Sequence, residues 1–194
     1  MEDEPTLLEH LEDAVNQFEV VTMRLDRSQP DKFWSGRVLA VCNEVAYCES
    51  YDPDGFFDGW LVVTLDEITG IVRGGVQNEC LERLIEYRGG RDERPPLLMG
   101  PNLFESLYAH ACKAGCLVLL DGEESATDDF ITGIIERVTK SNLLVREYDD
   151  CGERGEVIAI PKHTIVTAEV GTRYLGSLSF LAGLTRSCGT RAED

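Results

Sequence analysis

A short motif, Tyr-Asp-x-x-Gly, occurs at residues 51–55 and again at 148–152, and this repetition limits the folds open to the sequence. The two copies lie 97 residues apart, half the length of the 194-residue sequence. Aligning 33–84 with 130–181 without a gap gives ten identical positions of 52. The identical pairs are Phe33/Phe130, Gly36/Gly133, Val41/Val138, Tyr51/Tyr148, Asp52/Asp149, Gly55/Gly152, Ile68/Ile165, Gly74/Gly171, Leu81/Leu178 and Leu84/Leu181. Glycines match at expected turns and apolar residues match between them, so the sequence predicts a tandem duplication.

Both halves open with a pattern typical of a helix start. Thr6 is followed three residues later by Glu9, and Asn102 by Glu105. In such a capping box the cap side chain and the acid satisfy free backbone N–H groups. Apolar residues then recur at helical spacing, Leu7, Leu8, Leu11 and Val15 in the first half and Leu103, Phe104, Leu107 and Ala111 in the second. Each half is therefore expected to begin with an amphipathic helix.

Five short strands are expected after each of these helices, because β-branched residues are enriched and turn residues recur at short, even intervals. The expected strands are 20–25, 33–42, 45–51, 59–65 and 68–73, then 116–120, 130–138, 143–148, 156–160 and 164–170. A closing helix is expected at 78–87, with Asn78 as its cap and Leu81, Leu84 and Ile85 facing inward, and a weaker one at 174–184.

The repeated motif is interpreted as the hinge between the third and fourth strands of each half. Its aspartate can accept hydrogen bonds from the turn backbone, and its glycine supplies a positive φ. Tyr51 and Tyr148 are expected to close a strand with the hydroxyl at the rim. The expected organisation is a first repeat at 1–90, a Gly- and Pro-rich linker at 91–101, a second repeat at 102–184 and a flexible tail at 185–194.

This order of elements, with a one-turn break between the last two strands at 65–68 and 161–165, resembles the Sm-like small β-barrel. The stretch at 71–75, IVRGG, looks like the Ile/Val-Arg-Gly end of the second Sm motif, and Gly36 and Gly133 stand where the first motif has its glycine. The resemblance covers roughly 20–73 and 117–170. It implies a mainly β chain with short helices, built as two tandem five-stranded Sm-like barrels, each preceded by an N-terminal helix. The run at 58–69, DGWLVVTLDEIT, is also similar to uncharacterised bacterial proteins.

Sm-like proteins form rings through edge strands and bind single-stranded RNA with the loops after the second and fourth strands. If this is carried over, Arg73 and Gly74 occupy the second RNA-binding loop of the first half. The second half has Val170 and Gly171 there, without the arginine.

The charge of the chain argues for other partners than nucleic acid. Thirty-six acidic and eighteen basic residues give a net charge of −18, which repels phosphates and anionic membrane surfaces.

The N-terminus lacks the basic and apolar regions of a signal peptide, and no segment has the length of apolar sequence that a membrane helix needs. The seven cysteines are interpreted as reduced thiols, so a cytoplasmic protein is expected.

Few residues suggest chemistry. Asp52, Asp54 and Asp58 lack the ligand order of a calcium loop and are interpreted as a solvated turn. His110, Cys112 and Cys116 form a small cluster of soft ligands without a second pair at zinc-finger spacing, so packing is preferred over a metal site. No catalytic residue, metal site or cofactor is therefore predicted.

The most unusual side chains are four aromatic residues of the first half, Trp34, Phe56, Phe57 and Trp60. Aromatic residues concentrate at protein interfaces, although one of the phenylalanines could instead fill the mouth of the barrel. We therefore expect a non-enzymatic protein-interaction or assembly module, whose partner is another protein or a second copy. The alternatives left open are an RNA-binding Sm-like protein and a metal-dependent enzyme.

Overall fold

The computed structural model describes residues 5–25, 33–89, 102–122 and 130–184. Contacts divide the chain into two compact units, Met1–Asp58 with Val63–Leu97 and Gly59–Val62 with Leu98–Asp194. The linker expected at 91–101 and the tail expected at 185–194 lie outside the described residues.

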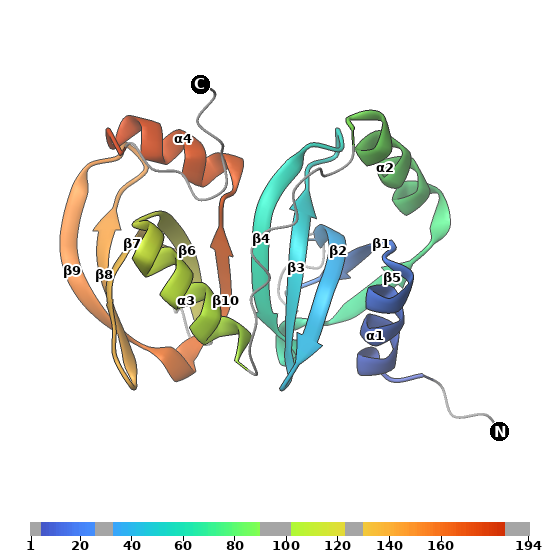
Figure 1. Cartoon of the computed structure of the whole chain (residues 1–194), viewed down its shortest axis with the longest axis horizontal. Helices are drawn as coiled ribbons and strands as arrows, with labels where there is room; N and C mark the ends of the chain where they lie inside the picture. The colour runs from blue at the N-terminus through green and yellow to red at the C-terminus, as the bar shows by residue number, and fades with distance from the viewer. Residues whose placement is uncertain (1–4, 26–32, 90–101, 123–129, 185–194) are drawn as a thin grey trace. The chain divides into compact units, whose positions relative to one another are not determined.

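The elements of the two halves occur in the same order (Figure 1). Those of the first half are α1 (Leu7–Gln17), β1 (Val20–Arg24), β2 (Phe33–Cys42), β3 (Val45–Tyr51), β4 (Phe57–Thr64), the 3-10 turn η1 (Leu65–Glu67), β5 (Gly70–Arg73) and α2 (Gly75–Tyr87). Those of the second half are α3 (Leu103–Ala114), β6 (Leu117–Gly122), β7 (Ile131–Val138), β8 (Asn142–Tyr148), β9 (Arg154–Pro161), η2 (Lys162–Thr164), β10 (Ile165–Val170) and α4 (Arg173–Leu181).

The structure is mainly β, as expected, and the paired strands within each half are antiparallel. The strands of the first half follow the order β5-β1-β2-β3-β4, and those of the second half follow β10-β6-β7-β8-β9. In each half the fifth strand pairs with the first, β5 with β1 and β10 with β6. A closed barrel would also need hydrogen bonds between the fourth and fifth strands of a half. The order of the described strands contains no such pair, so the sheet is not a closed barrel.

The Tyr-Asp-x-x-Gly motif forms the same turn in both halves. The Asp52 Oδ1 atom accepts the N–H groups of Asp54 and Phe56 at 3.0 and 2.9 Å. The Asp149 Oδ1 atom accepts those of Cys151 and Glu153 at 3.0 and 2.8 Å. Both glycines, Gly55 and Gly152, have positive φ, at 82° and 79°. The sequence-based interpretation of this motif as a hinge between the third and fourth strands is therefore confirmed.

The glycine of the second strand lies close to the backbone of the third. A Cβ atom added to Gly36 would lie 2.0 Å from the Glu49 carbonyl oxygen, and one added to Gly133 would lie 2.4 Å from that of Arg146. The register of both strand pairs shifts just beyond, between Val38 and Ala40 and at the equivalent position of β7. A glycine followed by a bulge allows each second strand to bend sharply across the sheet.

The predicted helix starts are partly confirmed. Thr6 and Glu9 form the complete capping box of α1. At α3 the Asn102 side chain accepts the N–H of Glu105, but the Glu105 carboxylate binds the Lys162 Nζ atom at 2.6 and 2.8 Å instead of returning to the cap. Such an ion pair depends on the fold and cannot be predicted from the spacing of the capping box.

The start of α2 differs from the prediction. The helix begins at Gly75 with Gly74 as its N-cap, three residues before the expected start, and Asn78 is not a cap. The Asn78 side chain is buried, and its amide is satisfied there: it donates a hydrogen bond to the Val72 carbonyl oxygen and accepts one from the Thr22 hydroxyl.

Each half has its own apolar cluster beneath its closing helix. Leu81 and Ile85 of α2 pack with Val20 and Tyr51, and Leu175 and Leu178 of α4 pack with Leu117. Leu84, which was expected to face inward, is 36% exposed. The opening helices cover the second strands, since α1 contacts β2 and α3 contacts β7.

Candidate functional site

The four aromatic residues expected at a partner surface do not form an exposed group. Trp34 and Trp60 are buried, and the indole of Trp34 lies against Gly36. The Phe57 ring packs edge-on against the Tyr51 ring, with centroids 6.0 Å apart, and contacts the core cluster of the first half. Only Phe56 is exposed, at 42%, with the Arg88 guanidinium 4.1 Å from its ring centroid. Phe57 thus packs against the core of the first half instead of lying in an exposed aromatic group.

Arg73, the arginine of the Sm-like resemblance, is held within the first half. Its guanidinium forms ion pairs with Glu19 and with Asp13, the latter at 3.0 Å. The hydrogen bond to Glu19 is the main reason that the pKa of Arg73 is raised. These carboxylates occupy donors that a phosphate would need, so the geometry of Arg73 does not favour the RNA-binding alternative.

Gly74, the second residue of that alternative, lines a pocket of about 430 Å³ in the first half. The pocket lies where the ends of β1 and β5 meet the start of β2 and the first turn of α2. Arg24, Phe33, Val72 and Val76 also line it. The sequence offered little to identify this pocket, because its residues come from four separate elements. The one local signal was the Gly74-Gly75 pair at the end of a strand.

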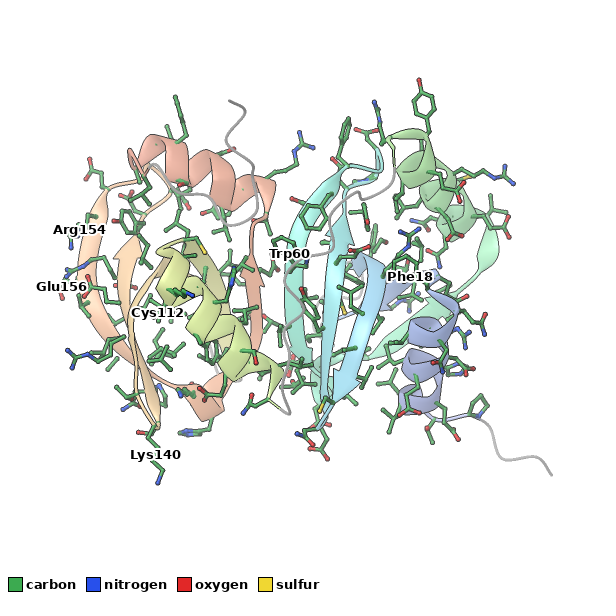
Figure 2. The ribbon with its side chains drawn as sticks, in the orientation of Figure 1. Phe18, Trp60, Cys112, Lys140, Arg154 and Glu156 are labelled. Atoms are coloured by element: carbon green, nitrogen blue, oxygen red, sulfur yellow. The ribbon has the colours of Figure 1, made fainter. Side chains whose placement is uncertain are left out.

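The last strand of the sheet order, β9, is unusually exposed. Of its eight residues only Ile160 is buried and Ile158 is intermediate, although 157–160 reads VIAI. In Figure 2 Arg154 and Glu156 project away from this strand. Its equivalent β4 has five consecutive buried residues, from Gly59 to Val63. Sequence reasoning missed this difference because both strands have the composition of a buried strand.

A buried charged cluster links the elements of the first half. The Arg37 guanidinium lies 3.8 Å from the Glu49 carboxylate and 3.6 Å from that of Glu82. It also lies 4.6 Å from the centroid of the Phe18 ring, which is labelled in Figure 2. The Tyr51 hydroxyl donates to Glu49 Oε1 at 2.7 Å, so it points into this cluster and not to the rim as expected. The equivalent positions of the second half, 97 residues further along the chain, are Ile134 and Arg146 in place of Arg37 and Glu49. This arginine–glutamate pair therefore has no equivalent in the second half.

The soft-ligand residues of α3 do not converge. Cys116 is buried, with its Sγ atom 4.0 Å from the Ala111 carbonyl oxygen, and Gly115 ends the helix in a left-handed conformation. Cys112 is only partly buried and lies on the helix itself (Figure 2). Within the described ranges, no three His, Cys, Asp or Glu residues are grouped so as to hold a metal ion.

The thiols of the described cysteines should differ strongly in reactivity. Cys48 is fully buried, and its burial, with the neighbouring Glu49 charge, raises the pKa of its thiol well above the usual range. Cys80 and Cys151 are exposed. Because the thiolate is the nucleophile, a short treatment with iodoacetamide should modify Cys80 and Cys151 and leave Cys48 intact until urea unfolds the chain. Peptide mass spectrometry measures this directly, and equal labelling of Cys48 and Cys151 in the native protein would contradict the structure.

Comparison with known proteins gives no identification: no protein-family model, curated protein or solved structure matches the chain. Among the described helices, none combines the length and the apolar character needed to cross a membrane.

Proposed function

We propose that this chain is a non-enzymatic assembly module built from two Sm-like repeats, and that it associates through the exposed strand β9. The repeat and Sm-like parts of the proposal are supported by the common order of elements in the two halves. They are further supported by the 3-10 turn before each fifth strand and by the shared glycine and bulge in each second strand. The RNA-binding and metal-dependent alternatives have no comparable support in the described residues.

The exposure of β9 carries this proposal. A strand at the end of a sheet presents unpaired backbone N–H and C=O groups, which can pair with a strand of another chain. The side chains of Val157, at 39% exposed, and Ala159 are accessible beside these groups, so an added strand would also bury apolar surface. The binding mode is strand addition, in which main-chain hydrogen bonds supply affinity.

Replacing Val157 or Ala159 by lysine should abolish association, because a charge on an edge strand opposes pairing with another strand. Native mass spectrometry of the untagged wild type should show a complex, either of several copies or with a co-purified protein. The lysine variants should lose that complex while keeping the wild-type circular dichroism spectrum.

Phe180→Lys is the matched control, since Phe180 is an apolar residue of α4 with 83% exposure and lies outside β9. This variant should associate as the wild type does. The proposal fails if the wild type is a bare monomer at all concentrations and captures no protein, or if its complex survives both lysine substitutions.

A further inference from the structure

The pocket of the first half differs in chemistry from the surface around it. None of the described residues that line it is acidic, in a chain with 36 acidic and 18 basic residues. Arg24 is the one charged residue among the described residues that line it; it is exposed and forms no ion pair with another described residue. The charge of the described lining is therefore positive, opposite in sign to the net charge of the chain, and favours an anionic group.

The rim of the pocket is apolar. Phe33, Val72 and Val76 line it with exposed fractions of 55, 48 and 78%. Large apolar side chains from three different elements are thus partly open to water around one hollow. A ligand with an apolar group would cover them, and removing this surface from water is favourable.

The floor of the pocket is polar but already satisfied. The Thr22 hydroxyl lies 2.7 Å from Asn78 Oδ1 and 3.0 Å from the Ser35 hydroxyl, and Asn78 Nδ2 donates to the Val72 carbonyl oxygen at 3.0 Å. These bonds join β1, β2, β5 and α2, so they hold the shape of the pocket before any ligand arrives. Because the floor has its own partners, the charged group of a ligand would be held at Arg24.

We infer that this pocket binds a carboxylate that carries an apolar substituent. The planar guanidinium of Arg24 can take a carboxylate through two parallel hydrogen bonds, and the apolar rim receives the substituent. A volume of about 430 Å³ lies within the usual range for small-ligand sites. The carboxylate belongs either to a free organic acid or to the last residue of a peptide, because both present the same chemistry. This binding is separate from the strand addition proposed for β9.

NMR titration of the full chain tests the inference with three probes: N-acetylleucine, its neutral amide, and a short peptide ending in leucine with a free carboxylate. N-acetylleucine should shift the amide signals of Gly74, Gly75 and Gln77, which line the pocket. The amide should bind at least about tenfold more weakly, because the charge-assisted hydrogen bonds are lost. Tighter binding of the peptide would identify a chain terminus as the source, and tighter binding of N-acetylleucine a free acid.

Arg24→Gln should weaken binding of the carboxylate probes by about tenfold or more and leave the weak binding of the amide unchanged. Arg83→Gln removes the same charge from an exposed position of α2 outside the pocket and should bind as the wild type does. Arg24 is exposed, so its replacement should preserve the remaining NMR spectrum. The inference is overturned if neither carboxylate probe shifts the pocket signals, or if N-acetylleucine and its amide bind equally.

Discussion

Replacing Gly36 by alanine is expected to destabilise the first half by about 3 kcal/mol, a large part of the stability of a typical domain. The new Cβ atom would lie 2.0 Å from the Glu49 carbonyl oxygen and 2.6 Å from the Trp34 ring. The carbonyl belongs to the paired backbone of β3, so relief requires the strands to separate where they hydrogen-bond. Urea denaturation followed by Trp fluorescence should show a lower midpoint with an unchanged slope.

Gly70→Ala is the matched control, because Gly70 also lies in a strand of the first half but has its nearest obstacle, the Arg24 side chain, at 4.0 Å. The free energy of unfolding of this variant should differ from that of the wild type by no more than about 0.5 kcal/mol. Equal midpoints for Gly36→Ala and Gly70→Ala would show that β2 and β3 do not approach as closely as described.

Replacing Arg37 by alanine should lower the free energy of unfolding by about 3 kcal/mol or more. The carboxylate of Glu49 stays buried in this variant but loses the positive charge of the Arg37 guanidinium. The Glu49 side chain is only 2% exposed, and the Arg37 guanidinium lies 3.8 Å from its carboxylate. Arg37 also stacks on the Phe18 ring at the end of α1, so packing is lost together with the charge. Thermal and urea unfolding of the variant measure the loss.

Arg146→Ala is the control for an exposed pair. Arg146 binds the Glu136 carboxylate at 3.0 Å, but the Glu136 side chain is 40% exposed, so the loss should stay below about 1 kcal/mol. A double variant, Arg37→Ile with Glu49→Gln, should recover part of the stability lost in Arg37→Ala because no buried charge remains. If the double variant is less stable than Arg37→Ala, the charge of Glu49 is not the cause of the loss.

Features that depend on neighbouring residues could be predicted from the sequence. The hinges at Asp52 and Asp149 and the capping box at Thr6 are closed by hydrogen bonds that span two to four residues, so the spacing of the side chains decides them. The strands 33–42 and 45–51 were predicted with the bounds that the structure has, because a tight turn separates two β-rich runs.

The candidate sites were less predictable. Trp34 and Phe57 have the composition of an interface, but their burial depends on Gly36 and on the closing helix α2. In the sequence Val72 and Val76 are ordinary apolar residues. They line a pocket because β5 and α2 lie next to each other in the fold. Exposure is a property of the packed chain, and composition alone does not decide it.

The order of the elements, the two hinges and the glycines at which the second strands bend could be predicted from the amino-acid sequence, because they follow from local hydrogen bonding and backbone sterics. Three features depend on the packed fold: β9 ends the strand order of the second half, Glu105 pairs with Lys162 and not with its own helix cap, and the Arg37 side chain is buried beside the Glu49 carboxylate. These outcomes depend on which distant segments of the chain come into contact. Whether a charged or polar side chain is buried with a partner or left in water is decided by those contacts.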